Sequence, residues 1–164
     1  DQYEEAIINL GKALDIRIKL FGEENEDVAD CYYNLGRAYY WNEQYVQAIV
    51  NHQKAFEIRI SLFGEEHEDV ADCYNDLGND YYWAEQYDPS VNYHKRAFEI
   101  RAVLFGEKSE KADESRFSLG QAYYYADMDK LAEECFSVSL KFRKKLYGKK
   151  SKEYIKAKEW LEKI

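Results

Sequence analysis

The sequence contains little that would break the chain or anchor it in a membrane. One proline and eight glycines in 164 residues leave little room for linkers, so we expect an ordered chain nearly throughout. No apolar run approaches the roughly 18 residues of a membrane span, and no signal-peptide pattern opens the chain. These absences predict a cytoplasmic protein. The chain starts inside a repeat and without an initiator methionine, which indicates a fragment of a longer protein.

Residues that bind metals or perform catalysis are also scarce. Cys31, Cys73 and Cys135 are an odd number and lack the paired spacing of a disulfide scaffold or a zinc site. Cys31 and Cys73 are expected to be free thiols, buried side by side. His52 and His94 are expected to be half-buried packing residues. Motifs such as G-x-S-x-G, a phosphate loop or H-E-x-x-H are missing, so we expect no enzyme, no cofactor and no metal.

Positive charge is rare in most of the chain. Residues 1–140 carry 13 basic and 29 acidic side chains, whereas residues 141–164 carry ten basic and three acidic ones. Nucleic-acid binding requires a basic face, so the acidic body argues against it. The lysine-rich end is the part that could touch an acidic surface. The simpler alternative is that it forms a solvated cap.

What the sequence does contain is a 42-residue repeat. Residues 20–45 read LFGEENEDVADCYYNLGRAYYWNEQY, and residues 62–87 repeat most of that segment. Glycines recur with this period at 22, 64, 106 and 148, and again at 36, 78 and 120. The expected units are about 1–42, 43–84 and 85–126, followed by a divergent unit or cap at 127–164. A period in this range predicts a solenoid of stacked repeats.

Each unit is expected to contain two helices, as at residues 26–41 and 45–63, and a last helix is expected at 151–164. Gly36 falls inside the first of these helices at a cost of about 1 kcal/mol relative to alanine. It therefore predicts two helices that cross too closely for a side chain. Gly64 is expected to be a left-handed C-cap. Asp88 and Pro89 are expected to be the N-cap and the first residue of another helix.

The repeat resembles the tetratricopeptide repeat, on the pattern Tyr32-x2-Leu35-Gly36-x2-Tyr39 followed by Ala48-x3-His52. Its longer period and its ALDIRIKLFG-like helix ends are similar to the kinesin-light-chain type. The resemblance implies an all-α fold, an α-solenoid in which antiparallel helix pairs form one right-handed superhelix over residues 1–164. It also implies a protein–protein interaction scaffold, because the family binds many unrelated ligands.

In such repeats the first helix of each unit lines the concave side. Residues opposite its packing stripe recur at positions i, i+3, i+7, i+10 and i+11, which lie on one side of a helix. The expected binding residues are Asp30, Tyr33, Arg37, Tyr40, Trp41, Asp72, Asn75, Asn79, Tyr82, Trp83, Glu114, Phe117, Gln121 and Tyr124. Acidic and aromatic side chains predominate on this face, which favours a basic or amphipathic peptide. A clamp for a C-terminal carboxylate is not expected, since Arg37 is the one cation.

Two alternatives remain open for these residues. Asp30, Asp72 and Glu114 lie near the starts of their helices and could simply interact with the helix dipole. Trp41 and Trp83 could pack between repeats instead of binding a partner.

A structural role is the second hypothesis for the whole chain. Residues 2–21 form a second helix without its own first helix, so Ile7, Leu10 and Leu14 are expected to be partly uncovered. The opposite end carries Trp160 and a basic surface. An acidic N-terminal end and a basic C-terminal end would permit head-to-tail self-association. Such a contact joins successive copies into an open chain and not into a closed ring.

Overall fold

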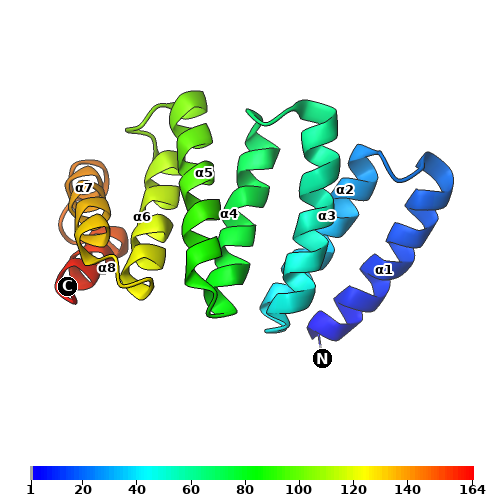
Figure 1. Cartoon of the computed structure of the whole chain (residues 1–164), viewed down its shortest axis with the longest axis horizontal. Helices are drawn as coiled ribbons and strands as arrows, with labels where there is room; N and C mark the ends of the chain where they lie inside the picture. Colours follow the sequence, from blue (N-terminus) through cyan, green and yellow to red (C-terminus); the bar gives the residue numbers. More distant parts are fainter. Residues whose placement is uncertain (1) are drawn as a thin grey trace. The chain divides into compact units, whose positions relative to one another are not determined.

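The fold is all-α, as expected from the repeat. The computed structural model describes residues 2–164, and within them it contains helices and no strands. Eight helices follow one another along this part of the chain (Figure 1), namely α1 (Gln2–Phe21), α2 (Glu26–Trp41), α3 (Tyr45–Phe63), α4 (Glu68–Trp83), α5 (Tyr87–Phe105), α6 (Glu110–Tyr125), α7 (Asp129–Tyr147) and α8 (Lys152–Leu161). The even-numbered helices are the first helices of their repeats, and the odd-numbered ones are the second helices.

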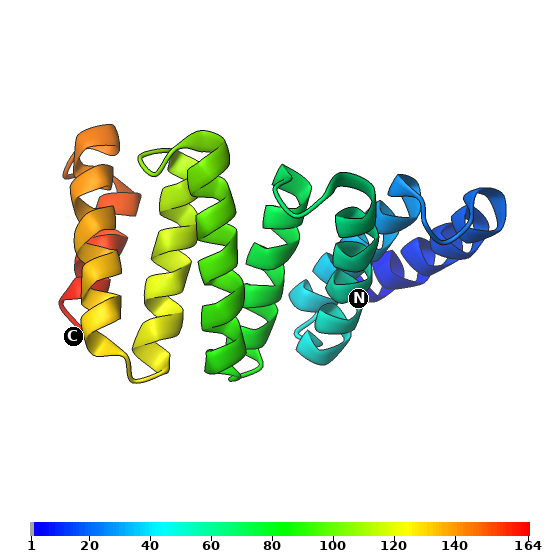
Figure 2. The same ribbon diagram turned by 45° about the horizontal axis from the view of Figure 1, so that its top comes forward.

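The chain divides into two compact units, an N-terminal unit, Asp1–Glu85, and a C-terminal unit, Gln86–Ile164. In the N-terminal unit α1 packs on α2, α2 on α3 and α3 on α4. In the C-terminal unit α5 packs on α6, α6 on α7 and α7 on α8, as the turned view also shows (Figure 2). This packing of each helix on its neighbours in sequence is that of an α-solenoid.

The turn after each second helix depends on glycine. Gly64 has φ 79° and ψ 170°, so the expected positive φ is confirmed, whereas the expected left-handed helical ψ is wrong. This extended region with positive φ is open essentially to glycine alone. The Gly64 N–H still donates to the carbonyl oxygen of Ile60 at 3.0 Å and closes the last turn of α3.

Helix starts differ between the two kinds of helix. First helices begin with a side-chain cap, as where Asn25 Oδ1 accepts from the Asp27 N–H at 2.9 Å. The predicted start of the fifth helix at Asp88 and Pro89 is wrong, because α5 begins at Tyr87 after Gln86. Pro89 is therefore the third helical residue, where its missing N–H costs nothing because first-turn N–H groups have no partner within the helix.

The expected close crossing at the repeated glycine is confirmed at two positions. A Cβ added to Gly36 would lie 2.5 Å from His52 Nε2, and one added to Gly120 would lie 2.9 Å from Phe136 Cε1. In contrast, a Cβ on Gly11 would meet nothing within 4 Å. The glycine inside α2 and α6 therefore permits the second helix of the same repeat to approach.

A ladder of arginines, which was not predicted, joins each second helix to the next first helix. The arginines recur every 42 residues near the ends of α1, α3, α5 and α7, at positions 17, 59, 101 and 143. Each donates through Nη1 to a backbone carbonyl ten residues further on, at 2.9, 3.3, 3.4 and 3.3 Å respectively. The last three are buried. Their 42-residue spacing is the signal in the sequence that indicates them.

Helix α1 is the least covered helix of the N-terminal unit and contributes no buried residue. Ile7, Leu10 and Leu14 are half-buried, as expected. Elsewhere, Cys31 and Cys73 are buried free thiols and Cys135 is a half-buried one. Among residues 2–164, no helix combines the length and the apolar character needed to cross a bilayer.

His94 on α5 is a buried histidine that makes the stability of the fold depend on pH. Its ring is 1% exposed, and within residues 2–164 its Nδ1 has no hydrogen-bond partner. Burial, with the charge of Arg101, lowers the pKa of His94 from 6.5 to about 3. The unfolded chain therefore binds a proton near pH 6.5 that the folded chain does not, so stability falls as the pH drops below 6.5. The loss is about 2 kcal/mol at pH 5.

We expect His94→Phe to remove this acid-dependent loss, since phenylalanine already occupies the equivalent position 136. Urea unfolding at pH 7.5 and pH 5 measures the difference for each protein. His67→Gln is the control outside the core, because the His67 side chain is 41% exposed and its replacement should change the difference less than His94→Phe does. Equal acid destabilisation of His94→Phe and the parent protein would contradict the assignment.

Candidate functional site

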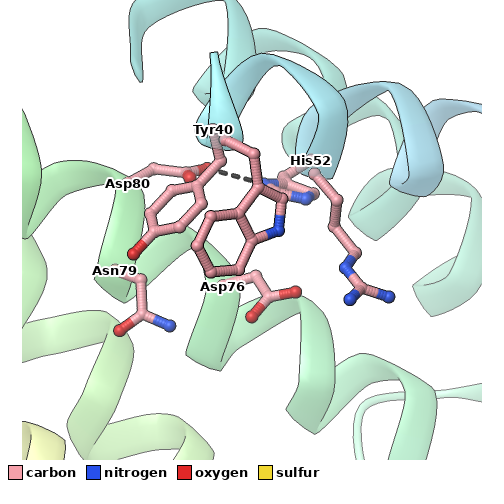
Figure 3. Close-up of a pocket in the computed structure, with 7 residues that line it drawn as sticks. Tyr40, His52, Asp76, Asn79 and Asp80 are labelled. Atoms are coloured by element: carbon pink, nitrogen blue, oxygen red, sulfur yellow. Dashed lines mark hydrogen bonds and ion pairs between the residues drawn. The ribbon is translucent and has the colours of Figure 1, made fainter. Parts of the chain in front are cut away.

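A hollow of about 300 Å³ opens in the N-terminal unit between α2, α3 and α4. We call it the aromatic hollow (Figure 3). Its lining residues are Arg37, Tyr40 and Trp41 from α2, His52 from α3, and Asp76, Asn79 and Asp80 from α4. Four of the predicted binding residues thus meet here, whereas His52 and the two aspartates were not predicted as site residues.

Aromatic rings form one wall of this hollow and continue beyond it. Tyr40 meets Trp41 edge-on with ring centroids 5.2 Å apart, and it also meets Tyr45 edge-on at 5.8 Å. Trp83 stacks on Tyr45 with ring centroids 6.3 Å apart. Even so, Trp41 is 58% exposed and Trp83 is 53% exposed. Packing between rings therefore explains only part of this cluster and leaves a broad apolar surface open.

Beneath the rings lies a buried histidine–aspartate pair (Figure 3). His52 Nδ1 and Asp80 Oδ2 are 2.6 Å apart, and both side chains are at most 1% exposed. Burial raises the pKa of Asp80 to about 6, although the hydrogen bond from His52 opposes the shift. The expectation that His52 is half-buried is therefore wrong.

The sequence holds a signal for this pair in the residues one period away from Asp80. The residues 42 positions before and after Asp80, at positions 38 and 122, are both alanine. An acidic residue at a position that is otherwise small and apolar indicates a specific partner, since a buried carboxylate needs one.

Arg59 engages two of the predicted binding residues. Its Nη2 donates to Asp30 Oδ1 at 2.8 Å, and its guanidinium lies 4.4 Å above the ring of Tyr33. Burial raises the pKa of Tyr33, with a further contribution from the neighbouring Asp76, to which Tyr33 is hydrogen-bonded. Asp30 therefore holds Arg59 within one repeat, and Tyr33 also links α2 to Asp76 on α4 of the next repeat. Neither the dipole alternative nor the binding prediction described these roles.

In the C-terminal unit the first-helix face is different. A hollow of about 350 Å³ between α6, α7 and α8 is lined by Glu114, Phe117, Ser118, Gln121, Arg143, Lys152, Glu153 and Lys156. Three of these residues are basic and two are acidic, so the acidic character expected from the sequence is not found here. Predicted residues Glu114 and Gln121 do line the hollow.

Phe117 was expected on the open face, but it is a core residue. It is 4% exposed and meets Phe136 at 5.4 Å, with the guanidinium of Arg143 4.1 Å from its ring. Tyr124 likewise packs edge-on against Trp160 at 5.6 Å. The repeat formed by α6 and α7 therefore uses these aromatic positions to pack α8.

The remaining predicted residues lie outside both hollows, on α4. Asn75 donates to Asp76 Oδ1 at 3.5 Å, and Tyr82 meets Trp83 edge-on at 5.5 Å. Asp72 is half-buried. Throughout residues 2–164, no cluster of three or more His, Cys, Asp or Glu side chains is arranged to hold a metal ion.

Comparisons with known proteins agree on the repeat. A tetratricopeptide repeat family model matches residues 34–101 and also residues 74–145. A Podosopora anserina protein described as a kinesin light chain with nearly identical TPR-like repeats has a similar structure, with TM-score 0.87 and 19% identity over 99% of this chain and 76% of that chain. No curated protein matches the chain at the level of sequence.

Two other solved structures are similar. BtubC (BKLC) from P. vanneervenii has TM-score 0.82 and 27% identity over 90% of this chain and 59% of that one. The N-terminal domain of stress-induced protein-1 (STI-1) from C. elegans has TM-score 0.61 and 20% identity, over 82% of this chain and 95% of that domain. These likenesses support the α-solenoid fold.

Proposed function

Since the chain belongs to the tetratricopeptide repeat family, whose repeats mediate protein–protein interactions, we propose that it binds a basic or amphipathic segment of a partner protein. The segment lies on the first-helix face of the N-terminal unit. Scaffolds of this fold are typically non-enzymatic, and we assign no catalytic residue. The unpaired thiols of the three cysteines suit a reducing compartment, and we therefore place the protein in the cytoplasm.

The aromatic hollow is the observation that carries this proposal. It combines the open indole of Trp41 with the carboxylates of Asp76 and Asp80. An aromatic face beside carboxylates suits a lysine or arginine side chain, which gains both a cation–π contact and a charge-assisted hydrogen bond. Asp80 is buried and already paired with His52, so Asp76 is the carboxylate that a basic side chain can approach beside Trp41.

The neighbouring exposed rings extend the surface for an apolar side chain of the same segment. Trp83 stacks on Tyr45 and keeps more than half of its surface open. Tryptophan and tyrosine are the residues that most often dominate binding energies at protein interfaces. A segment that alternates basic and apolar residues would use both the hollow and this extension.

Trp41→Ala is the variant that tests the proposal. Peptide arrays that vary in lysine, glutamate and leucine content are probed with the whole chain, and the tightest binder is measured by fluorescence anisotropy. We expect basic or basic–apolar peptides to be retained. We expect Trp41→Ala to weaken the binding about 5- to 30-fold, since removal of a central tryptophan costs about 1–2 kcal/mol.

Phe21→Ala is the matched control, because Phe21 is also an exposed ring, at 53% against 58% for Trp41, but lies at the end of α1. It should leave the affinity unchanged. Selection of acidic peptides, or full binding by Trp41→Ala, would refute the proposal.

Head-to-tail self-association is the second candidate, and the surface of α1 favours it. Ile8, Ile16 and Leu20 are 58%, 57% and 68% exposed. Such a surface favours contact with another protein, and the basic end of a second copy is the complementary choice. Sedimentation of the free chain at low and high salt accompanies the peptide experiment as its control. A monomer at every concentration would eliminate this candidate.

A further inference from the structure

A second kind of hollow lies away from the first-helix face just described. In the C-terminal unit it has a volume of about 340 Å³ and is formed by the α5–α6 turn, α6 and α7. Its lining residues are Glu107, Lys108, Arg116, Val138, Lys141, Phe142 and Lys145. With four cations and one carboxylate it carries a net charge of +3, and we call it the basic hollow.

The N-terminal unit has the equivalent hollow, with a volume of about 320 Å³. Its lining residues are Glu23, Glu24, Tyr32, Lys54, Glu57, Ile58 and Ser61. Each of the seven lies two repeat periods before its counterpart in the basic hollow. With three carboxylates and one lysine this hollow carries a net charge of −2, and we call it the acidic hollow.

The basic and acidic hollows show that the fold requires the shape of this hollow but not the sign of its charge. The same backbone elements and the same seven positions form a hollow of nearly the same size with either sign of charge. Glu24, Glu57 and Ser61 are replaced by lysines, and Tyr32 is replaced by Arg116. The positive charge of the three lysines in the basic hollow is therefore not required by packing.

Nothing in the described chain neutralises the three lysines. Arg116 is fixed, because its Nη2 donates to the Glu107 carbonyl at 2.8 Å and its Nη1 lies 3.4 Å from Asp113 Oδ1. Within residues 2–164, Lys108, Lys141 and Lys145 have no ion-pair partner. Like charges around one hollow repel one another, and a bound anion relieves that repulsion.

Apolar surface accompanies this charge. Val138 is 47% exposed and lies beside Phe142 in the lining. In the acidic hollow the equivalent of Val138 is Lys54, whose Nζ lies 4.9 Å from the centroid of the Tyr32 ring. The basic hollow thus has no lysine at its apolar side, while it has lysines at three other positions.

We propose that the basic hollow binds an acidic segment of a partner protein. Carboxylates of that segment pair with Lys108, Lys141 and Lys145, and an apolar side chain covers Val138 and Phe142. Lys141 and Lys145 are one helical turn apart on α7 and present separate point charges, which suit successive acidic residues. A lone phosphate would leave the apolar lining uncovered. This site is separate from the aromatic hollow and opposite to it in charge preference.

The test uses the fluorescein-labelled peptide Glu-Leu-Glu-Glu-Leu-Glu and fluorescence anisotropy with the whole chain at low salt. The informative variant is Lys108→Glu, Lys141→Glu and Lys145→Ser, which installs the residues of the acidic hollow. Because those residues already line a hollow of this shape, the variant should fold. We expect it to bind the peptide at least about tenfold more weakly.

A control for net charge is Lys149→Glu, Lys150→Glu and Lys130→Ser, which makes the same change outside the hollow. It should retain most of the binding, as should Trp41→Ala, so this proposal and the proposed function can fail separately. Equal loss in the charge control would overturn the site. Equal affinity for Glu-Ser-Glu-Glu-Ser-Glu would overturn the acidic–apolar ligand in favour of a simple anion site.

Discussion

Replacing Arg143 with methionine should lower the free energy of unfolding by about 3 kcal/mol, the low end of the usual cost of removing one partner of a buried ion pair. Arg143 Nε donates to Asp113 Oδ2 at 2.7 Å, and the two side chains are 8% and 3% exposed. Methionine keeps an apolar side chain at this position but removes the guanidinium from above the Phe117 ring, so the loss comes mainly from the uncompensated carboxylate. Arg116 remains 3.4 Å from Asp113 Oδ1, which places the cost below that of a fully isolated charge.

Urea unfolding of a double-mutant cycle measures this coupling. The repeat itself supplies the second substitution, because the positions equivalent to Asp113 are Ala29 and Ala71. Asp113→Ala combined with Arg143→Met should recover part of the lost stability, since the uncompensated carboxylate is removed. Recovery is incomplete because Arg116 also loses Asp113, although its Nη2 still donates to the Glu107 carbonyl. Lys158→Met is the surface control. Lys158 and Glu162 form an ion pair with side chains 56% and 61% exposed, and its loss should leave unfolding unchanged. A double variant as unstable as Arg143→Met would contradict this interpretation.

Gly36→Ala should destabilise the fold, whereas Gly11→Ala should stabilise it. At Gly36 the new methyl group would lie 2.5 Å from His52 Nε2. The ring cannot move away easily, because His52 is 1% exposed and its Nδ1 is held by Asp80 at 2.6 Å. Overpacking of this kind costs about 1–3 kcal/mol, from which the helix propensity of alanine recovers up to about 1 kcal/mol.

At Gly11 no clash opposes the higher helix propensity of alanine, because a methyl group there meets nothing within 4 Å. The two variants thus make the same chemical change in helix interiors with opposite expected signs. Thermal or urea unfolding of both decides the matter. A stabilised Gly36→Ala would show that the second helix can shift outward and that the glycine is not required for the crossing.

Much of the fold follows from local pattern and could be predicted. The predicted helix limits at Phe21, Trp41 and Phe63 are confirmed, because glycines and polar turns mark where the 42-residue pattern is interrupted. The helix whose predicted start is wrong, α5, is the one where Pro89 imitates a helix start. Proline is tolerated throughout the first turn, so its position alone does not fix the first residue.

The candidate site could be predicted only in part. The spacing of Arg37, Tyr40 and Trp41 put them on one face of α2, and they do line one hollow. The same periodic spacing placed Phe117 on the open face of α6, yet Phe117 is buried. The reason is that α8 packs against α6 and brings Trp160 and Lys156 to the Phe117 ring. A helical period identifies a face, but whether that face is open depends on the helix that comes next.

By itself, the sequence determined the all-α repeat, the limits of most helices and the close crossing at Gly36, since each depends on residues near one another or on a strict period. Only the tertiary structure decided that Asp80 pairs with His52, that Asp30 holds Arg59, and that one recurring hollow is acidic in one unit and basic in the other. These features depend on side chains from different helices meeting in space. Their energies come from burial and from the distance between charges, and neither quantity is written in the spacing of one helix.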